Sequence, residues 1–300
     1  MSPASATVRK DLFDPEFMRR LESLEIASRK IFTGKMRGEK RSRRKGFSQE
    51  FADYRDYVHG DDLRHLDWNV YGRLDKLFLK MFYEEEDLHL HLLVDGSRSM
   101  DFGDPNKFAY ARQVAAAIGY VGLVNLNPVS IRVLRKGEES IMRTARGERM
   151  VWRMMDFLQG VQPDAGTDLA GGLKRFAISR PRRGVAILIS DFLDRDGYDQ
   201  ALKWLLGAGM ESYVLHVLAP QEVQPSLRGD LKLMDMEDAD LVELSLTGNL
   251  AKSYEKTLAA FRAGLAASCS KYGMAYTFSS TGSPFDELVL LYLRRAGLVK

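Results

Sequence analysis

The amino-acid sequence predicts an α/β fold in which a doubly wound, mostly parallel sheet carries helices on both faces. Two observations lead to this class. From residue 88 onward, short apolar runs of strand length alternate with longer runs of helical spacing, which is the pattern of parallel strands joined by crossover helices. The run at residues 185–190 is apolar up to its last residue, Ser190, as expected of a strand that is covered on both faces.

The predicted elements of this region follow one another in a regular order. Strands are expected at residues 88–94, 129–134, 140–144 (a short edge strand), 185–190, 212–218 and 275–279. Helices are expected at residues 105–124, 148–158, 169–179, 198–206, 250–271 and 284–296. Asp104 is the expected N-cap of the first helix and Pro105 its first residue, because proline suits that position. Residues 221–249 contain two segments that alternate with period two, which predicts an inserted β-hairpin.

The first 87 residues are organised differently. Residues 1–46 combine a predicted helix at 14–30 with a basic linker. This linker, residues 35–45, holds seven Lys or Arg residues and one acidic residue, Glu39. Residues 47–87 are rich in aromatic and charged side chains and predict a small β-containing subdomain with a strand at 77–82. Residues 88–300 then form the α/β domain, with the hairpin insertion near 221–249.

Composition limits the class of protein and its compartment. The chain has 300 residues, of which 45% are hydrophobic and 28% charged, and its net charge is +3. These values are typical of a globular protein and do not indicate a polyanion binder. The single cysteine, Cys269, excludes an internal disulfide or a cysteine-based zinc site. Neither a signal peptide nor a membrane span is predicted, because a span needs about 20 apolar residues, so we expect a cytoplasmic protein.

Five oxygen-bearing side chains come from three distant parts of the chain. Asp95, Ser97 and Ser99 follow the first strand, Thr167 lies in a loop that enters a helix, and Asp191 follows the strand at 185–190. In a doubly wound sheet, loops at the carboxyl ends of the strands can converge at one edge. Carboxylate and hydroxyl oxygens are hard ligands, so we expect these residues to bind Mg²⁺ or Mn²⁺.

This set resembles the metal-ion-dependent adhesion site of von Willebrand factor A domains, and all five positions match. The run at residues 54–68, the Glu50-Phe51 pair before it and the acidic residues 84–86 are similar to the signature of the domain-of-unknown-function 58 family. The resemblance runs from about residue 47 to the C-terminus, and it extends to the hairpin and to the last helix, strand and helix.

The resemblance implies a function that composition does not show. Ser97, Ser99 and Thr167 would contact the ion directly or through water, and Asp95 and Asp191 would orient the waters or bind directly. An open coordination position would accept a Glu or Asp of a partner protein, and we expect Arg98, Met100 and Asp168 to contact that partner. Members of the family are thought to act as adaptors with MoxR-type AAA+ ATPases. We therefore expect a non-enzymatic interaction module that works in chaperone-like assembly.

Two alternatives to this function remain open at this stage. A metal-dependent hydrolase of the phosphatase type could use the same ion to polarise a phosphoryl oxygen, although no general base is evident. The basic segment 35–45 could instead bind nucleic acid or an acidic surface.

Three other groups of residues have structural interpretations. His89 and His91 have a spacing that can chelate zinc, but no third ligand is evident, and we interpret both as core histidines that are packed or hydrogen-bonded. The polar cluster of Asp61, Asp62, Arg64, Asp67 and Trp68 is interpreted as an ion-paired scaffold that joins the subdomain to the α/β domain. We expect Cys269 to be a packing residue of the helix at 250–271.

Overall fold

The chain divides into two compact units, which are described one at a time. Residues Lys30–Asp87 form the smaller unit, and Met1–Arg29 together with Leu88–Lys300 form the larger one. The computed structural model describes residues 13, 15–21, 45–59, 61–83, 89–137, 139–163, 166, 168–225, 229–234, 241–246 and 248–295. Of the basic segment 35–45, only residue 45 lies within these ranges.

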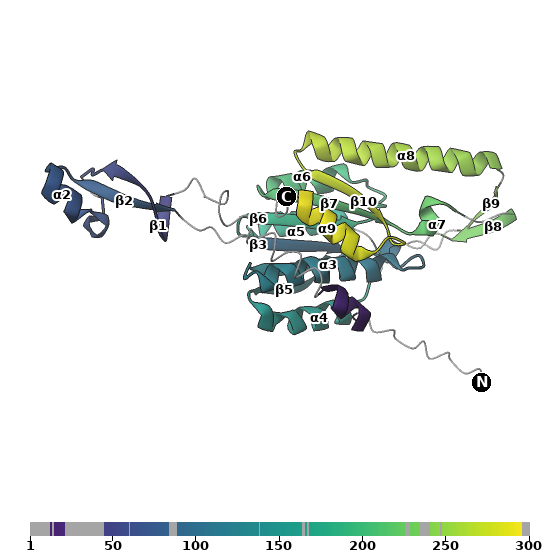
Figure 1. Cartoon of the computed structure of the whole chain (residues 1–300). Helices are drawn as coiled ribbons and strands as arrows, with labels where there is room; N and C mark the ends of the chain where they lie inside the picture. Colours follow the sequence, from purple (N-terminus) through teal and green to yellow (C-terminus); the bar gives the residue numbers. More distant parts are fainter. Residues whose placement is uncertain are drawn as a thin grey trace. The chain divides into compact units, whose positions relative to one another are not determined.

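The larger unit is built on a six-stranded sheet (Figure 1). Its strands are β3 (His89–Asp95), β4 (Val129–Leu134), β5 (Ser140–Ala145), β6 (Gly184–Ser190), β7 (Glu211–Leu218) and β10 (Ala275–Ser280). They lie in the order β10-β7-β6-β3-β4-β5, and only β5 is antiparallel to its neighbour. The chain starts at β3 in the middle of the sheet and adds β4 and β5 on one side of it. It then returns to add β6, β7 and β10 on the other side, which is the doubly wound order. The predicted fold class is confirmed.

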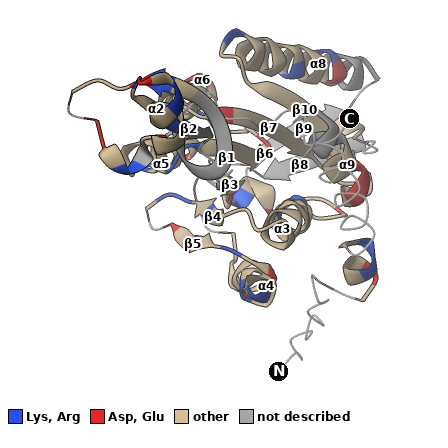
Figure 2. Cartoon of the chain, turned by 60° about the vertical axis from the view of Figure 1, so that its left-hand side comes forward, with Lys and Arg blue, Asp and Glu red and all other residues tan. Residues whose placement is uncertain are grey.

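Helices cover both faces of this sheet, as Figure 1 shows with α3 and α4 on one side and α8 on the other. The described helices are α3 (Lys107–Val124), α4 (Val151–Gly160), α5 (Leu169–Ile178), α6 (Asp199–Gly207), α7 (Pro220–Val223), α8 (Gly248–Lys271) and α9 (Phe285–Arg295). Two 3₁₀ turns, Arg98–Met100 and Glu148–Met150, precede α3 and α4. In Figure 2 the central strands are mostly tan, whereas blue and red mark the helices and loops around them.

The hydrophobic core explains why β3 is the central strand. All seven of its residues are buried. Leu93 packs in a cluster with residues of α5, α6 and α8, including Leu173, Leu205 and Cys269. On the opposite face α3 passes so close to β3 that a Cβ at Gly122 would lie 2.5 Å from the Cδ1 atom of Leu90. Each such side chain contributes about 1.5–3 kcal/mol by burial, so the sheet is a firm support for the loops at its ends.

The start of α3 differs from the prediction. Asn106, not Asp104, is the N-cap, because its side-chain oxygen accepts a hydrogen bond from the backbone N–H of Ala109 at 2.9 Å. The helix therefore begins at Lys107, two residues after Pro105. Asparagine and aspartate are equally good caps, so the sequence pattern alone does not distinguish the two positions.

The described part of the predicted N-terminal helix, residues 15–21, belongs to the larger unit. Phe17 and Leu21 are fully buried, and the ring of Phe17 lies 4.8 Å from that of Phe285 at the start of α9. The guanidinium of Arg20 lies 3.3 Å from the carboxylate of Asp286. The ring contact and the ion pair together attach the N-terminal helix to α9.

The predicted hairpin is present as the antiparallel strands β8 (Gly229–Met234) and β9 (Leu241–Leu246). The predicted turn at residues 237–239 lies outside the described residues. The hairpin is inserted between α7 and α8, so it interrupts the alternation of the main sheet without entering it.

The smaller unit contains the antiparallel strands β1 (Lys45–Asp56) and β2 (Phe78–Tyr83), a 3₁₀ turn (Leu63–His65) and α2 (Trp68–Leu74). Asp67 is its polar centre and caps α2 through the N–H groups of Asn69 and Val70. The hydroxyl of Tyr54 donates to its carboxylate at 2.9 Å, and the ammonium of Lys80 lies 3.1 Å away. The ion-paired character predicted for this cluster is thus present, although Trp68 itself is exposed.

Two of the structural interpretations made from the sequence are confirmed. His91 is buried, with one ring nitrogen 2.8 Å from the Ser130 hydroxyl and the other 2.8 Å from the Arg182 carbonyl oxygen. Cys269 is fully buried, and this burial raises the pKa of its thiol to about 12. Within the described residues, none of the helices is both long and apolar enough to cross a membrane.

Candidate metal-dependent docking site

The candidate site lies at the carboxyl ends of β3 and β6, two neighbouring parallel strands. The sheet is extended on one side of β3 first and on the other side from β6 onward, so this is its topological switch point. Asp95 is the last residue of β3, and Asp191 directly follows β6. Because β3 and β6 are parallel and paired, these two residues leave the sheet at the same edge. Both are buried, with 2% and 1% of their surface exposed. This geometry is consistent with the sequence prediction that the segment of Asp95 and the segment of Asp191 meet at one edge of the sheet.

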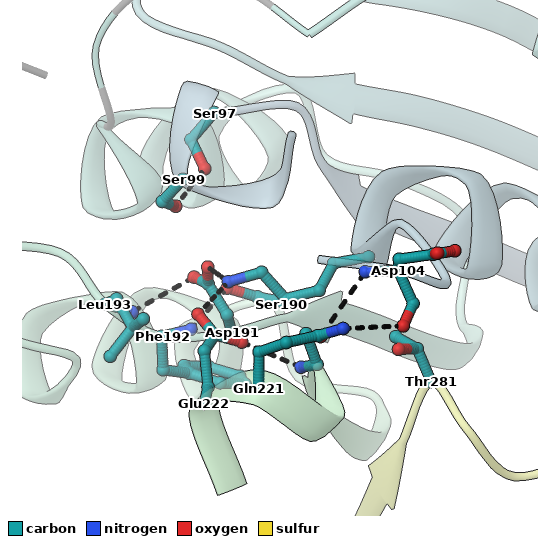
Figure 3. A network of polar contacts seen from close by, with 12 residues as sticks. Ser97, Ser99, Asp104, Ser190, Asp191, Phe192, Leu193, Gln221, Glu222 and Thr281 are labelled. Atoms are coloured by element: carbon teal, nitrogen blue, oxygen red, sulfur yellow. Dashed lines mark hydrogen bonds and ion pairs between the residues drawn. The ribbon is translucent and has the colours of Figure 1, made fainter. Parts of the chain in front are cut away.

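The loop after β3 holds its own shape through Asp95. The Oδ1 atom of Asp95 accepts a hydrogen bond from the backbone N–H of Ser97 at 2.9 Å, which forms a tight turn. The hydroxyls of Ser97 and Ser99 lie 2.9 Å apart and share a hydrogen bond. Figure 3 shows both serines on the loop that faces the residues around Asp191. Gly96 is needed in this turn, because a Cβ there would lie 2.6 Å from the Val133 side chain.

Ser190, which the sequence analysis did not single out, joins the two strands at the site. Its hydroxyl donates to Oδ2 of Asp95 at 2.6 Å and accepts from the N–H of Phe192 at 2.9 Å. Phe192 is buried and has a φ of +57°, an uncommon and strained value for a bulky residue. The N–H of Leu193 donates to Oδ1 of Asp191 at 3.1 Å, so the strained turn is fixed on both sides.

Burial and mutual repulsion perturb the charge on Asp95. Burial is the largest cause, and the nearby carboxylate of Asp191 adds to it; together they raise the pKa of Asp95 to about 6. The hydrogen bonds from Ser190 and Ser97 act in the opposite direction. The carboxylate of Asp191 therefore lies close enough to disfavour the negative charge of Asp95. A cation between two such groups would relieve this repulsion.

A buried lysine, also missed by the sequence analysis, completes the polar network around Asp191. Lys107 is the first residue of α3, and its ammonium lies 2.7 Å from Oδ2 of Asp191 and 2.6 Å from Oε1 of Glu222 in α7. None of the Lys107 surface is exposed. Although burial opposes its charge, the carboxylates of Asp191 and Glu222 raise the pKa of Lys107.

The other predicted site residues differ in their exposure and in whether the structure describes them. Thr167 lies outside the described residues, so its distance from Asp95 stays a prediction. Arg98 is exposed beside the serines, as a partner-binding residue must be. Met100, expected to contact a partner, is instead fully buried and forms part of the core. Asp168 caps α5 through the N–H of Gly171 and is partly exposed.

The described donors fit a hard divalent cation in kind. Asp95 and Asp191 offer carboxylates, and Ser97 and Ser99 offer hydroxyls, which are the oxygen ligands that Mg²⁺ and Mn²⁺ prefer. Among the residues that the structure describes, no group of three or more His, Cys, Asp or Glu side chains is placed to hold a metal. An ion here would therefore depend on the serine hydroxyls together with the two carboxylates.

Fold and site together define a class: an α/β protein of the doubly wound type with a polar, oxygen-rich site at its topological switch point. Comparison with known sequences then gives the family. Residues 53–264 match the family described as protein of unknown function DUF58, and the chain belongs to that family. The uncharacterized protein Rv1480 of Mycobacterium tuberculosis is 29% identical over 265 residues, which cover 86% of this chain and 83% of that protein.

Solved structures with some likeness to this chain are more distant in sequence. An aerotolerance-related membrane protein of Bacteroides fragilis is 15% identical, with a TM-score of 0.45. The match covers 69% of this chain and 97% of the chain of that protein. The VWA domain of SpRpn10 is 10% identical, with a TM-score of 0.39, over 68% of this chain and 94% of that one. The fold assignment therefore stands on the strand order of the chain itself.

Proposed function

We propose that this protein is a non-enzymatic interaction module that binds an acidic side chain of a partner protein through a divalent cation, Mg²⁺ or Mn²⁺. Asp95, Ser97, Ser99, Thr167 and Asp191 would hold the ion. The observation that supports this most strongly is the pairing of Asp95 and Asp191 at one sheet edge, with the hydroxyl pair of Ser97 and Ser99 on the loop above. When bound, the ion would supply an electrophilic position for an acidic oxygen.

The residues of the chain determine what such a site can do. Two carboxylates neutralise a divalent ion, and the neutral hydroxyls add no further negative charge, so an incoming carboxylate is not repelled. Ser190 and the backbone N–H groups hold the two aspartates in place before any ion binds. Arg98, exposed at the same loop, adds a positive charge that favours an acidic partner.

We further propose that the partner is a MoxR-type AAA+ ATPase, with the protein acting as its adaptor in chaperone-like assembly. This part rests on the family resemblance. The use of a single, buried cysteine supports a reducing compartment such as the cytoplasm.

A capture experiment tests the proposal. The purified chain would be immobilised and offered a MoxR-type ATPase from the same organism, with Mg²⁺ or with a chelator. We expect capture with Mg²⁺, loss of capture with the chelator, and loss in Asp95→Ala and in the milder Ser99→Ala variant, with circular dichroism confirming that each variant folds. Equal capture with the chelator, or by both variants, would overturn ion-dependent docking.

The same protein would be assayed with p-nitrophenyl phosphate and Mn²⁺. Turnover that disappears in the Ser99→Ala variant would overturn the non-enzymatic assignment and favour a metal-dependent hydrolase.

A further inference from the structure

The least expected group in the larger unit is the ammonium of Lys107. It is buried together with Asp191, of which 1% of the side chain is exposed, and with Glu222, of which 15% is exposed. A lysine is almost never fully buried unless it is paired. Breaking a buried ion pair is strongly destabilising, because the remaining charge is left without a partner. The lysine therefore belongs to the structure of the site and not to its solvated rim.

We propose that Lys107 is a positioning residue of the ion site, and that Lys107 and Glu222 form a fixed pair of opposite charges that sets the affinity for the divalent ion. This inference rests on the proposed function, because the ion is the one proposed there. Lys107 acts through Asp191, whose Oδ2 atom it contacts at 2.7 Å.

A count of charges gives the direction of each effect. Asp191 and Glu222 contact the ammonium, and Asp95 adds a third carboxylate beside Asp191, so the site carries two net negative charges when all groups are ionised. A divalent ion balances this charge. Removing the ammonium leaves three negative charges and strengthens the attraction, whereas neutralising Glu222 leaves one and weakens it. In a buried site these interactions are much less screened by solvent than on a surface.

Glu222 is held in place as firmly as Lys107. Its Oε2 atom accepts from the backbone N–H of Ala219 at 2.7 Å, and its carbonyl oxygen accepts from the hydroxyl of Tyr254 at 2.8 Å. The neighbouring Gln221 donates to the carbonyl oxygen of Asp104 at 2.8 Å, which attaches α7 to the loop between the serines and α3 (Figure 3). The pair thus keeps a fixed position relative to the candidate ligands, unlike a mobile surface ion pair.

Ion affinity in four forms of the full chain tests this inference. Titration calorimetry with Mg²⁺ and with Mn²⁺ would compare the wild type, Lys107→Met, Glu222→Gln and the double variant. We expect binding to tighten at least tenfold in Lys107→Met and to weaken at least tenfold in Glu222→Gln, about 1.4 kcal/mol in each direction. The double variant should return toward the wild-type affinity. Arg55→Met, which removes an ion pair with Asp61 in the smaller unit, is the matched control and should change nothing.

The outcomes separate this inference from the proposed function. If the wild type binds the ion but both single variants keep its affinity or shift it in the same direction, the inference is overturned while ion-dependent docking stands. If the wild type binds no ion but Lys107→Met does, Lys107 controls the site as inferred and the proposed function fails. If none of the four binds, both fail. Should Lys107→Met not fold, unchanged or tighter binding by Glu222→Gln alone would overturn the inference.

Discussion

Replacing Ser190 by alanine should destabilise the protein by removing one group that satisfies two buried partners. The Oδ2 atom of Asp95 loses a donor at 2.6 Å, and the N–H of Phe192 loses its acceptor at 2.9 Å. A hydrogen bond to a charged group contributes about 1.5–3 kcal/mol, and an unsatisfied buried N–H costs about 1–3 kcal/mol. Because these effects overlap, we expect the free energy of unfolding to fall by about 2–5 kcal/mol.

Urea denaturation of the full chain measures this loss, with an unchanged slope as evidence that the denatured state is the same. Ser212→Ala is the matched control. Ser212 is also buried, on the next strand but one from β3, yet its hydroxyl makes one long hydrogen bond, 3.2 Å, to the carbonyl oxygen of Met210. Its removal should cost no more than about 1.5 kcal/mol. If Ser190→Ala were no more destabilising than this control, Ser190 would not be the bridge between β3 and β6.

Three further predictions concern other parts of the chain. Burial opposes the charge of Asp67, but hydrogen bonds from Tyr54, Lys80 and two backbone N–H groups outweigh it and lower its pKa to about 2. The stability that Asp67 contributes should therefore be fully present above pH ~4 and be lost as the pH drops toward ~2. A pH series of unfolding over this range should show a smaller fall in Asp67→Asn than in the wild type, and an equal fall would argue against this pairing. Gly96→Ala should lower stability by about 1–3 kcal/mol, because the new Cβ would overlap Val133; an unchanged melting temperature would show that the turn after Asp95 yields easily. Cys269, buried and with its pKa raised to about 12, should resist iodoacetamide in the native protein and react after unfolding; rapid native labelling, followed by mass spectrometry, would contradict its burial.

The sequence was sufficient to predict the main sheet because periodicity and burial agree there. Apolar strands and helices alternate from residue 88 onward, and each of the predicted strands lies within a residue or two of an observed one. The smaller unit was predicted less completely. The strand at residues 45–56 contains polar and charged residues without clear alternation, and it is irregularly paired with β2. Such a strand is defined by its partner and not by its own pattern.

The candidate site was likewise predicted only in part. Asp95, Ser97, Ser99 and Asp191 were found because each stands next to a strong strand signal. Ser190 could have been noted as the one polar side chain of the otherwise apolar strand β6. The burial of Lys107 could not be predicted, since a lysine at the first position of a helix is usually solvated. Its partners lie 84 and 115 residues away, and only the fold brings them together.

The most direct test of this account is the position of a bound ion. Crystals of the full chain grown with Mn²⁺ would give an anomalous signal for the metal. The account predicts one strong peak at the carboxyl ends of β3 and β6, with oxygen ligands from Ser97, Ser99 and Thr167 and with Asp95 and Asp191 bound directly or through water. A crystal saturated with Mn²⁺ that shows no peak there, or a peak only elsewhere on the chain, would contradict it.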